Sequence, residues 1–163
     1  MPANLRRKTL GANVEPEIIF ARHGDINAGR KIFFAQGGAQ CNTCHRVAGE
    51  GRGFGPDLSR IATKHKTREA LLEQILHPNK VVEPPWQAHT IEMKNGEIFS
   101  GIIVNKSARE LELRIADGSV VKIDTAKILS DQPQKLSLMP EGLLQNFTAQ
   151  EAADLIAFLA SLR

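Results

Sequence analysis

The most constraining feature of this chain is a five-residue run with the pattern Cys-x-x-Cys-His, which is Cys41-Asn42-Thr43-Cys44-His45. This spacing is the attachment motif of c-type haem. Each cysteine sulfur forms a thioether with a haem vinyl group, and the adjacent histidine is then held under the iron as its proximal ligand. The motif therefore predicts one covalently attached haem c, bound by Cys41 and Cys44, with His45 as an axial ligand of the iron.

Two other interpretations of this cysteine motif are a thioredoxin-like redox site and a zinc site. A thioredoxin-like Cys-x-x-Cys is expected at the start of a helix that follows a strand in a βαβ pattern, and no such pattern surrounds Cys41. A zinc site needs four ligands, usually with a second pair of cysteines or histidines. The 163-residue chain has two cysteines, and its four other histidines are scattered singly. Both alternatives are less favoured than haem.

Composition excludes several other classes. A hydrophobic content of 42% and a charged content of 24% are ordinary for a globular domain. The chain has a formal net charge of only +3, and its basic residues are spread along the sequence. We therefore expect no nucleic-acid partner. We also expect no membrane span, because no stretch approaches the roughly 18 to 20 apolar residues that a span needs.

The N-terminal residues bear on localisation. Haem of the c type is attached outside the cytoplasm, yet no apolar signal core follows the basic run at residues 6–8. We therefore expect a mature form or an excised domain of a periplasmic or otherwise exported protein. Residues 1–22 have no clear period and carry Pro2, Gly11 and Pro16, so they are predicted to form a linker or loosely packed arm.

Three helices are predicted from their caps and apolar periods. The first begins at Asp25, buries one face and ends at Gly37-Gly38, and the second begins at Thr67 and stops before Pro78. The third begins at a capping box made by Thr148 and Glu151. The buried face of the first helix comprises Ile26, Gly29, Ile32 and Phe33, and the stripe of the third comprises Ala152, Leu155, Ile156, Leu159 and Leu162.

The period changes from helix to strand between residues 87 and 130. Apolar and polar residues alternate on both sides of Asn95-Gly96, which is a strong hairpin signal. A second hairpin is predicted at residues 116–118, with Gly118 in the left-handed conformation. A three-residue loop there places Val121 opposite Leu113 and Ile123 opposite Leu111, whereas a two-residue loop would place Lys122 opposite Leu113. The segment is predicted to be a small antiparallel sheet that curls into a barrel.

The helical parts resemble class I cytochrome c in element order and local motifs, over about residues 24–80 and 136–163. The resemblance implies that the first and last helices cross closely, with Gly29 allowing their backbones to approach and with Phe33 and Phe158 packing nearby. Otherwise, Gly29 would only weaken its helix, by about 1 kcal/mol. The motifs that carry the resemblance are Gly24-Asp25, Gly29, Phe33, residues 41–45, residues 55–58, Met139-Pro140 and residues 155–159.

More specifically, the chain from Gly24 onward resembles the haem-binding domain found at the C-terminus of large exported proteins of planctomycetes and verrucomicrobia. Those proteins often also contain dehydrogenase-like β-propeller and helical-repeat regions. In that family a small β-rich insertion precedes a Ser-Leu-Met-Pro-x-Gly-Leu stretch, which here is residues 137–143. His77 departs from the family pattern, which commonly has an acidic residue at that position.

These expectations define an α+β fold: a class I cytochrome c-like helical haem domain interrupted by a small antiparallel β-sheet or barrel. The haem domain is predicted to comprise residues 23–83 and 134–163, and the inserted β domain residues 84–133. The insertion is expected to cover one haem edge, with docking of a partner domain as an added role.

The sixth iron ligand is predicted to be Met139, because a thioether suits haem iron and Met139-Pro140 precedes the last helix on an irregular segment. His65 and His89 are the histidine alternatives. Three further residues are expected beside the cofactor. The Pro56 carbonyl is expected to accept the ring N–H of His45, and Arg60 and Trp86 are candidates for contact with the haem propionates. Solvation of Arg60, and a packing role for Trp86, are the competing interpretations.

The predicted function is single-electron transfer, from an exported dehydrogenase, fused or separate, to a respiratory acceptor. The chain itself is expected not to be an enzyme and to be monomeric as an isolated domain. The alternative is a haem sensor or redox enzyme, which would require an open or labile sixth position on the iron.

Overall fold

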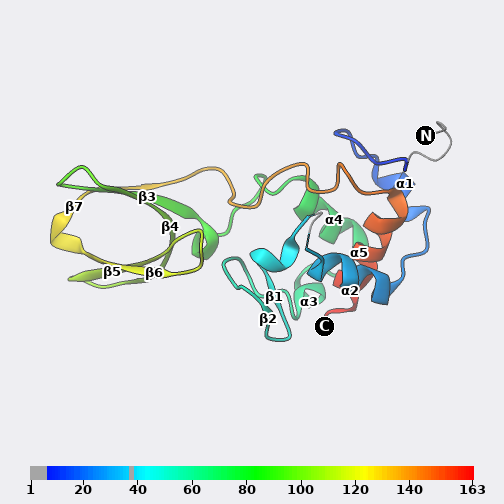
Figure 1. The fold of residues 1–163 in the computed structure, drawn as a ribbon, viewed down its shortest axis with the longest axis horizontal. Helices are drawn as coiled ribbons and strands as arrows, with labels where there is room; N and C mark the ends of the chain where they lie inside the picture. The colour runs from blue at the N-terminus through cyan, green and yellow to red at the C-terminus, as the bar shows by residue number, and fades with distance from the viewer. Residues whose placement is uncertain (1–6, 37–38) are drawn as a thin grey trace. The chain divides into compact units, whose positions relative to one another are not determined.

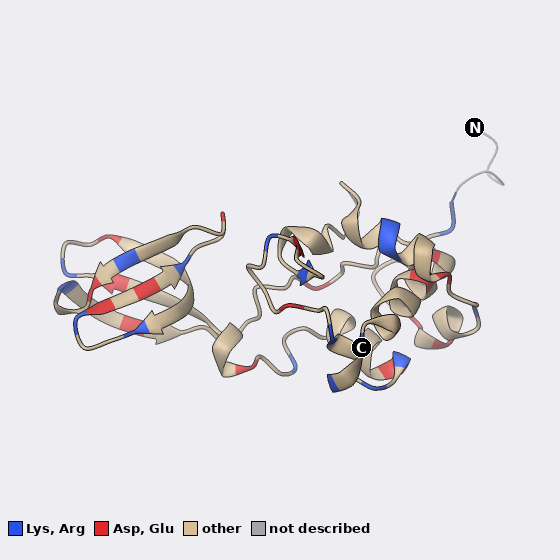
Figure 2. Cartoon of the chain, turned by 90° about the horizontal axis from the view of Figure 1, so that it is seen from below, with Lys and Arg blue, Asp and Glu red and all other residues tan. Residues whose placement is uncertain are grey.

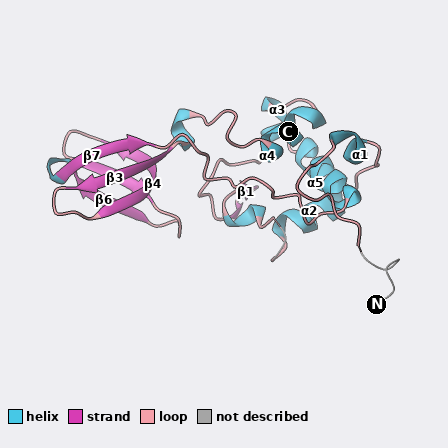
Figure 3. Cartoon of the chain, turned by 90° about the horizontal axis from the view of Figure 1, so that it is seen from above, coloured by secondary structure: helices cyan, strands magenta, loops and turns pink. Residues whose placement is uncertain are grey.

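A computed structural model describes residues 7–36 and 39–163 of the chain. The chain folds as two compact units, Met1–His77 with Glu141–Arg163, and Pro78–Pro140 (Figure 1). Helices make up most of the regular structure of the first unit, and a five-stranded sheet that of the second (Figure 3). This mixture fits the predicted α+β class, and the domain boundaries given above stay a prediction.

The predicted helix starts are confirmed by their caps. Asp25 Oδ1 accepts the Ala28 N–H at 2.6 Å, and Thr67 Oγ1 accepts the Ala70 N–H at 3.1 Å. Thr148 and Glu151 form the reciprocal capping box. The helices are α1 (Pro16–Phe20), α2 (Ile26–Phe34), α3 (Ile61–Lys64), α4 (Arg68–Leu76) and α5 (Ala149–Ser161). Helix α2 ends before the expected stop at Gly37-Gly38, and those two glycines lie outside the described residues.

Helices α2 and α5 cross at close range, as the resemblance implied. A Cβ built on Gly29 would overlap the backbone carbonyl of Asp154, so only glycine allows this approach. The rings of Phe33 and Phe158 pack beside the crossing, with centroids 5.6 Å apart. Ile26 departs from the predicted buried face, because it is the first residue of α2 and its side chain is 49% exposed.

The structure differs from the expected arm at residues 16–20. These residues form α1, which contacts α5 and buries Ile19 completely. The preceding segment is also attached, since the Leu10 N–H donates to the Phe147 carbonyl at 2.8 Å. A helix of little more than one turn is too short to show a period, which explains why the sequence pattern did not reveal it. Residues 1–6 of the predicted arm lie outside the described residues.

The second unit is built on one antiparallel sheet with the order β6-β5-β4-β3-β7. The last strand, β7, pairs with the first, β3, so the order differs from a simple row of hairpins, and β6 and β7 are the outer strands of that order. The predicted closure into a barrel stays a prediction. The core of this unit contains Met93, which is 7% exposed. The strands are β3 (Ala88–Met93), β4 (Ile98–Lys106), β5 (Glu110–Arg114), β6 (Val120–Asp124) and β7 (Ile128–Pro133), with 3-10 turns η3 (Pro84–Trp86) and η4 (Thr125–Lys127).

The predicted register of the second hairpin is confirmed. Leu111 pairs with Ile123 and Leu113 with Val121, while Gly118 has a φ of +87°. A one-residue slip would turn this apolar set to the opposite face of the sheet, so burial of Leu111 and Leu113 selects the loop length. Basic and acidic residues intersperse on these strands (Figure 2). For example, Lys122 lies 3.0 Å from a carboxylate oxygen of Glu110.

Candidate haem-attachment site

The Cys-x-x-Cys-His run folds into one tight turn directly after α2. Residues Cys41–Thr43 form the 3-10 turn η2, and the N–H groups of Cys44 and His45 both donate to the Cys41 carbonyl, at 3.2 and 2.8 Å. Thr43 Oγ1 donates to the Gln40 carbonyl at 2.7 Å, and Gln40 itself has a left-handed φ of 50°. The turn therefore fixes the spacing of the cysteines through local hydrogen bonds.

The His45 ring is held by the loop that follows. Its Nδ1 lies 2.9 Å from the Pro56 carbonyl oxygen, which is the contact expected from the sequence. A carbonyl oxygen can only accept, so Nδ1 carries the proton and Nε2 is the nitrogen that can ligate a metal. Gly55 leaves room for the ring, because a Cβ there would lie 3.0 Å from His45 Cε1.

Burial keeps this imidazole neutral. Removal from water lowers the pKa of His45, and the hydrogen bond to the Pro56 carbonyl opposes that effect only in part. A neutral ring is the form in which histidine ligates a metal. The position of His45 therefore suits an axial ligand.

The two cysteines are half-buried and are not joined by a disulfide. Burial raises the pKa of the Cys41 thiol to about 11, so this thiol is protonated at neutral pH. Cysteines of thioredoxin-like redox motifs instead have a lowered pKa, because the thiolate is the reactive form. The environment of Cys41 thus argues against the dithiol interpretation.

The zinc interpretation also loses support. Within residues 7–36 and 39–163, no three or more side chains of His, Cys, Asp and Glu come together as a group that could hold a metal ion. A structural zinc site needs four such ligands. Two free thiols in one turn, followed by a neutral histidine with Nε2 available, match the donor set of c-type haem.

The remaining predicted site residues are distributed over both units. Arg60 precedes α3 in the first unit and is exposed, with its backbone carbonyl accepting the Thr63 N–H at 3.0 Å. Trp86 and Met139 belong to the second unit and are half-buried. The structure brings Cys41, Cys44, His45 and Pro56 together, and the roles of all seven residues toward haem stay predictions.

Sequence reasoning missed the short hairpin that supports the site. Strands β1 (Arg46–Val47) and β2 (Glu50–Gly51) pair directly after His45, in a stretch where the sequence pattern predicted no strand. The Arg52 N–H then donates to the Asn42 carbonyl at 3.1 Å, which ties the end of the hairpin to the cysteine turn. The glycines at 49 and 51 both have positive φ and were the available signal for a tight reversal.

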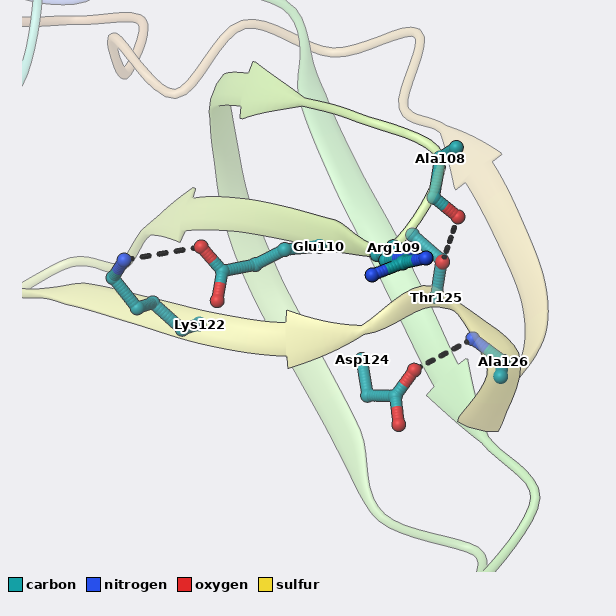
Figure 4. A pocket seen from close by; sticks show the side chains of 7 residues that line it. All are labelled: Ala108, Arg109, Glu110, Lys122, Asp124, Thr125 and Ala126. Atoms are coloured by element: carbon teal, nitrogen blue, oxygen red, sulfur yellow. Dashed lines mark hydrogen bonds and ion pairs between the residues drawn. The ribbon is translucent and has the colours of Figure 1, made fainter.

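The second unit has a pocket where β5 and β6 meet η4 (Figure 4). Three of its charged side chains bind one another or the local backbone: Lys122 pairs with Glu110, and Asp124 Oδ1 accepts the Ala126 N–H at 3.0 Å. None of the predicted haem residues lines this pocket. We therefore place the candidate site at residues 41–45.

Comparison with known proteins gives a family match over part of the chain. The family model described as Cytochrome c matches residues 26–99, which run from α2 through the cysteine turn and α4 into β4. No curated protein matches the chain. Among the described residues, none of the helices has the length and apolar character required to cross a membrane. The family match supports a c-type cytochrome domain within this chain, which implies covalently bound haem c and haem-based electron transfer.

Proposed function

We propose that this chain is a monohaem cytochrome that carries single electrons between two redox proteins. The observation that carries the proposal is the hydrogen bond between His45 Nδ1 and the Pro56 carbonyl, at 2.9 Å. It fixes the tautomer that leaves Nε2 for iron, and it sits directly beside the two thiols that would hold the porphyrin. Bound haem would supply one iron that cycles between the ferrous and ferric states.

The chain's own residues would have separate tasks. The sulfurs of Cys41 and Cys44 would hold the cofactor through thioether bonds, and His45 Nε2 would ligate the iron. The Pro56 carbonyl would keep the proton on Nδ1 and orient the ring, which raises the donor strength of the opposite nitrogen. We further propose contacts of Arg60 and Trp86 with the propionates, based on their side-chain chemistry.

We propose Met139 as the second axial ligand. Its thioether suits haem iron, and the backbone around it is irregular and ordered by hydrogen bonds. His89 is the histidine alternative, and its Nδ1 contact with Asp131 Oδ1 at 2.6 Å leaves its Nε2 available. We prefer Met139 because His89 lies within strand β3, whereas Met139 lies on the irregular segment before the last helix. A methionine ligand would block small molecules from the iron and raise its potential relative to a second histidine.

The proposed partners follow from this role. Electrons would come from an exported dehydrogenase, fused or separate, and would pass to a respiratory acceptor. The haem edge near the thioethers would be the exchange surface, with a small and transient interface. The location would be the periplasm or another compartment outside the cytoplasm.

The test is an optical spectrum of protein matured in a host that assembles c-type haem. We expect low-spin iron, a weak far-red band of methionine-ligated ferric haem, and no response to carbon monoxide. Met139→Ala should abolish the band and admit carbon monoxide. High-spin iron in the unchanged protein would instead favour a sensor or redox enzyme. Acid extraction checks attachment: haem should stay with the unchanged protein and leave a variant in which both Cys41 and Cys44 are alanine.

A further inference from the structure

Two segments of the second unit run beside each other at one end of the sheet. One leads into the first residue of β3, Ala88, and the other follows β7. The Gln134 N–H donates to the Ala88 carbonyl at 2.7 Å, and Gln87 Nε2 donates to the Gln134 carbonyl at 3.1 Å. Further out, the Ser137 N–H donates to Asn79 Oδ1 at 2.8 Å. The returning segment is therefore fastened at two places before it reaches residue 139.

The hydrogen bond between Ser137 and Asn79 is followed by a second one between Ser137 and Met139. Ser137 Oγ accepts the Met139 N–H at 3.1 Å, which closes a local turn of the kind that serine hydroxyls form two residues ahead of a backbone N–H. Asn79 thus holds the Ser137 backbone, and the Ser137 side chain holds the Met139 backbone. Two hydrogen bonds link an asparagine sixty positions away to the residue we propose as an iron ligand.

Polar contacts rather than burial order this stretch. Leu136 is 67% exposed and Leu138 is 42% exposed, so the apolar side chains on either side of Ser137 contribute little packing. Met139 itself is half-buried. A segment with so little buried apolar surface depends on its hydrogen bonds for a defined conformation.

We infer that Asn79 and Ser137 are positioning residues for the Met139 thioether. This inference rests on the proposed ligation by Met139. The two side chains keep the backbone of the ligand segment ordered, so that the sulfur competes effectively with other ligands for the iron. Loss of either hydrogen bond should free the segment and make the sulfur easier to displace.

The test measures displacement of the sulfur from the ferric holoprotein by imidazole, together with the far-red methionine band. In Asn79→Ala and in Ser137→Ala, imidazole should bind roughly tenfold more tightly, the change expected for the loss of one hydrogen bond. The band should weaken in both variants. Asn79→Asp and Ser137→Thr keep an oxygen acceptor and should remain close to the unchanged protein.

Matched controls exist in the same unit. Asn95 Nδ2 donates to Glu97 Oε2 at 2.7 Å in a hairpin turn, and Ser130 Oγ donates to Glu92 Oε2 at 3.2 Å. Asn95→Ala and Ser130→Ala remove the same side-chain types and should leave imidazole affinity unchanged. A change of equal size in these controls would overturn the positioning role, because it would be a general effect of loosening the sheet.

The outcomes separate this inference from the proposed function. If the unchanged protein has the band, loses it in Met139→Ala, and yet both alanine variants bind imidazole normally, the positioning role is wrong and methionine ligation stands. If Met139→Ala has no effect on the spectrum, methionine ligation is wrong and the positioning role falls with it. Ser137→Ala removes only a hydroxyl, so it decides the question even where Asn79→Ala does not fold.

Discussion

Asp154 Oδ1 accepts a hydrogen bond from the backbone N–H of Asp25 at 2.8 Å, so a carboxylate on one helix binds the N-cap residue of another. Asp154 lies in α5 and is 7% exposed, and the same oxygen also accepts from Gln150 Nε2 at 2.8 Å. Asp25 in turn caps α2, the helix that leads into the cysteine turn. The helix that leads into the attachment site thus starts at a residue held by a carboxylate 129 positions further along the chain.

Asp154→Ala should lower the free energy of unfolding by about 1–3 kcal/mol, because it removes a carboxylate that accepts hydrogen bonds from Asp25 N–H and Gln150 Nε2 at a part-buried contact. Asp154→Asn keeps an oxygen at this position and should cost less. Urea unfolding followed by circular dichroism measures both. An alanine variant as stable as the unchanged protein would show that water or another group satisfies Asp25.

Gly29→Ala should destabilise the protein by about 1–3 kcal/mol, since the added Cβ would overlap the Asp154 carbonyl where α2 crosses α5. Helix propensity alone predicts the opposite sign, a gain of up to about 1 kcal/mol. The sign of the change in unfolding free energy therefore tests the crossing. Asn27→Ala, at an exposed position of the same helix, should stay within about 0.5 kcal/mol.

Gly55→Ala should disturb the proximal histidine. The new Cβ would lie 3.0 Å from His45 Cε1 and 3.1 Å from Nδ1, so the ring must shift by a few tenths of an ångström, which disturbs its hydrogen bond to the Pro56 carbonyl. We expect a loss of about 0.5–1.5 kcal/mol of stability in the apoprotein and a smaller fraction of molecules carrying haem. Absorbance of haem relative to protein measures that fraction. Arg52→Ala, in the same loop with an exposed side chain, should load haem normally.

The sheet should lose stability in acid through Asp131. Desolvation acts to raise the pKa of this carboxyl, but hydrogen bonds from Lys106 and His89, with their charges, outweigh it and leave the pKa below its ordinary value. A carboxyl whose pKa is lower in the folded state stabilises that state fully above the unfolded pKa, which is about 3.9. This contribution is lost as pH falls through the folded pKa.

In Asp131→Asn, the free energy of unfolding should therefore decrease less as the pH is lowered than it does in the unchanged protein. The measurement is the free energy of unfolding of both proteins between pH 7 and pH 2. The difference between them should be largest near neutral pH and should shrink below about pH 4. A difference that stays constant across this range would mean that the ionised form of Asp131 has no special partner.

Local features of the sequence determined a large part of this structure. The caps at Asp25, Thr67 and Thr148 each depend on a side chain and an N–H three residues apart, so a short window contains both partners. The register of Leu111 and Leu113 follows from a period of two and a three-residue loop. The His45–Pro56 contact was expected as well, at a separation of only eleven residues.

The sequence by itself thus determined where the helices begin, how the second hairpin pairs and which turn offers two thiols and an imidazole. Only the tertiary structure decided that β7 pairs with β3, that Asp154 satisfies Asp25, and that Asn79 and Ser137 bond across 58 residues. The physical reason is that a periodic pattern records which face of an element is buried, but not which distant group it meets. Such partners depend on the packing of the complete chain, where a buried N–H must find an acceptor wherever the fold provides one.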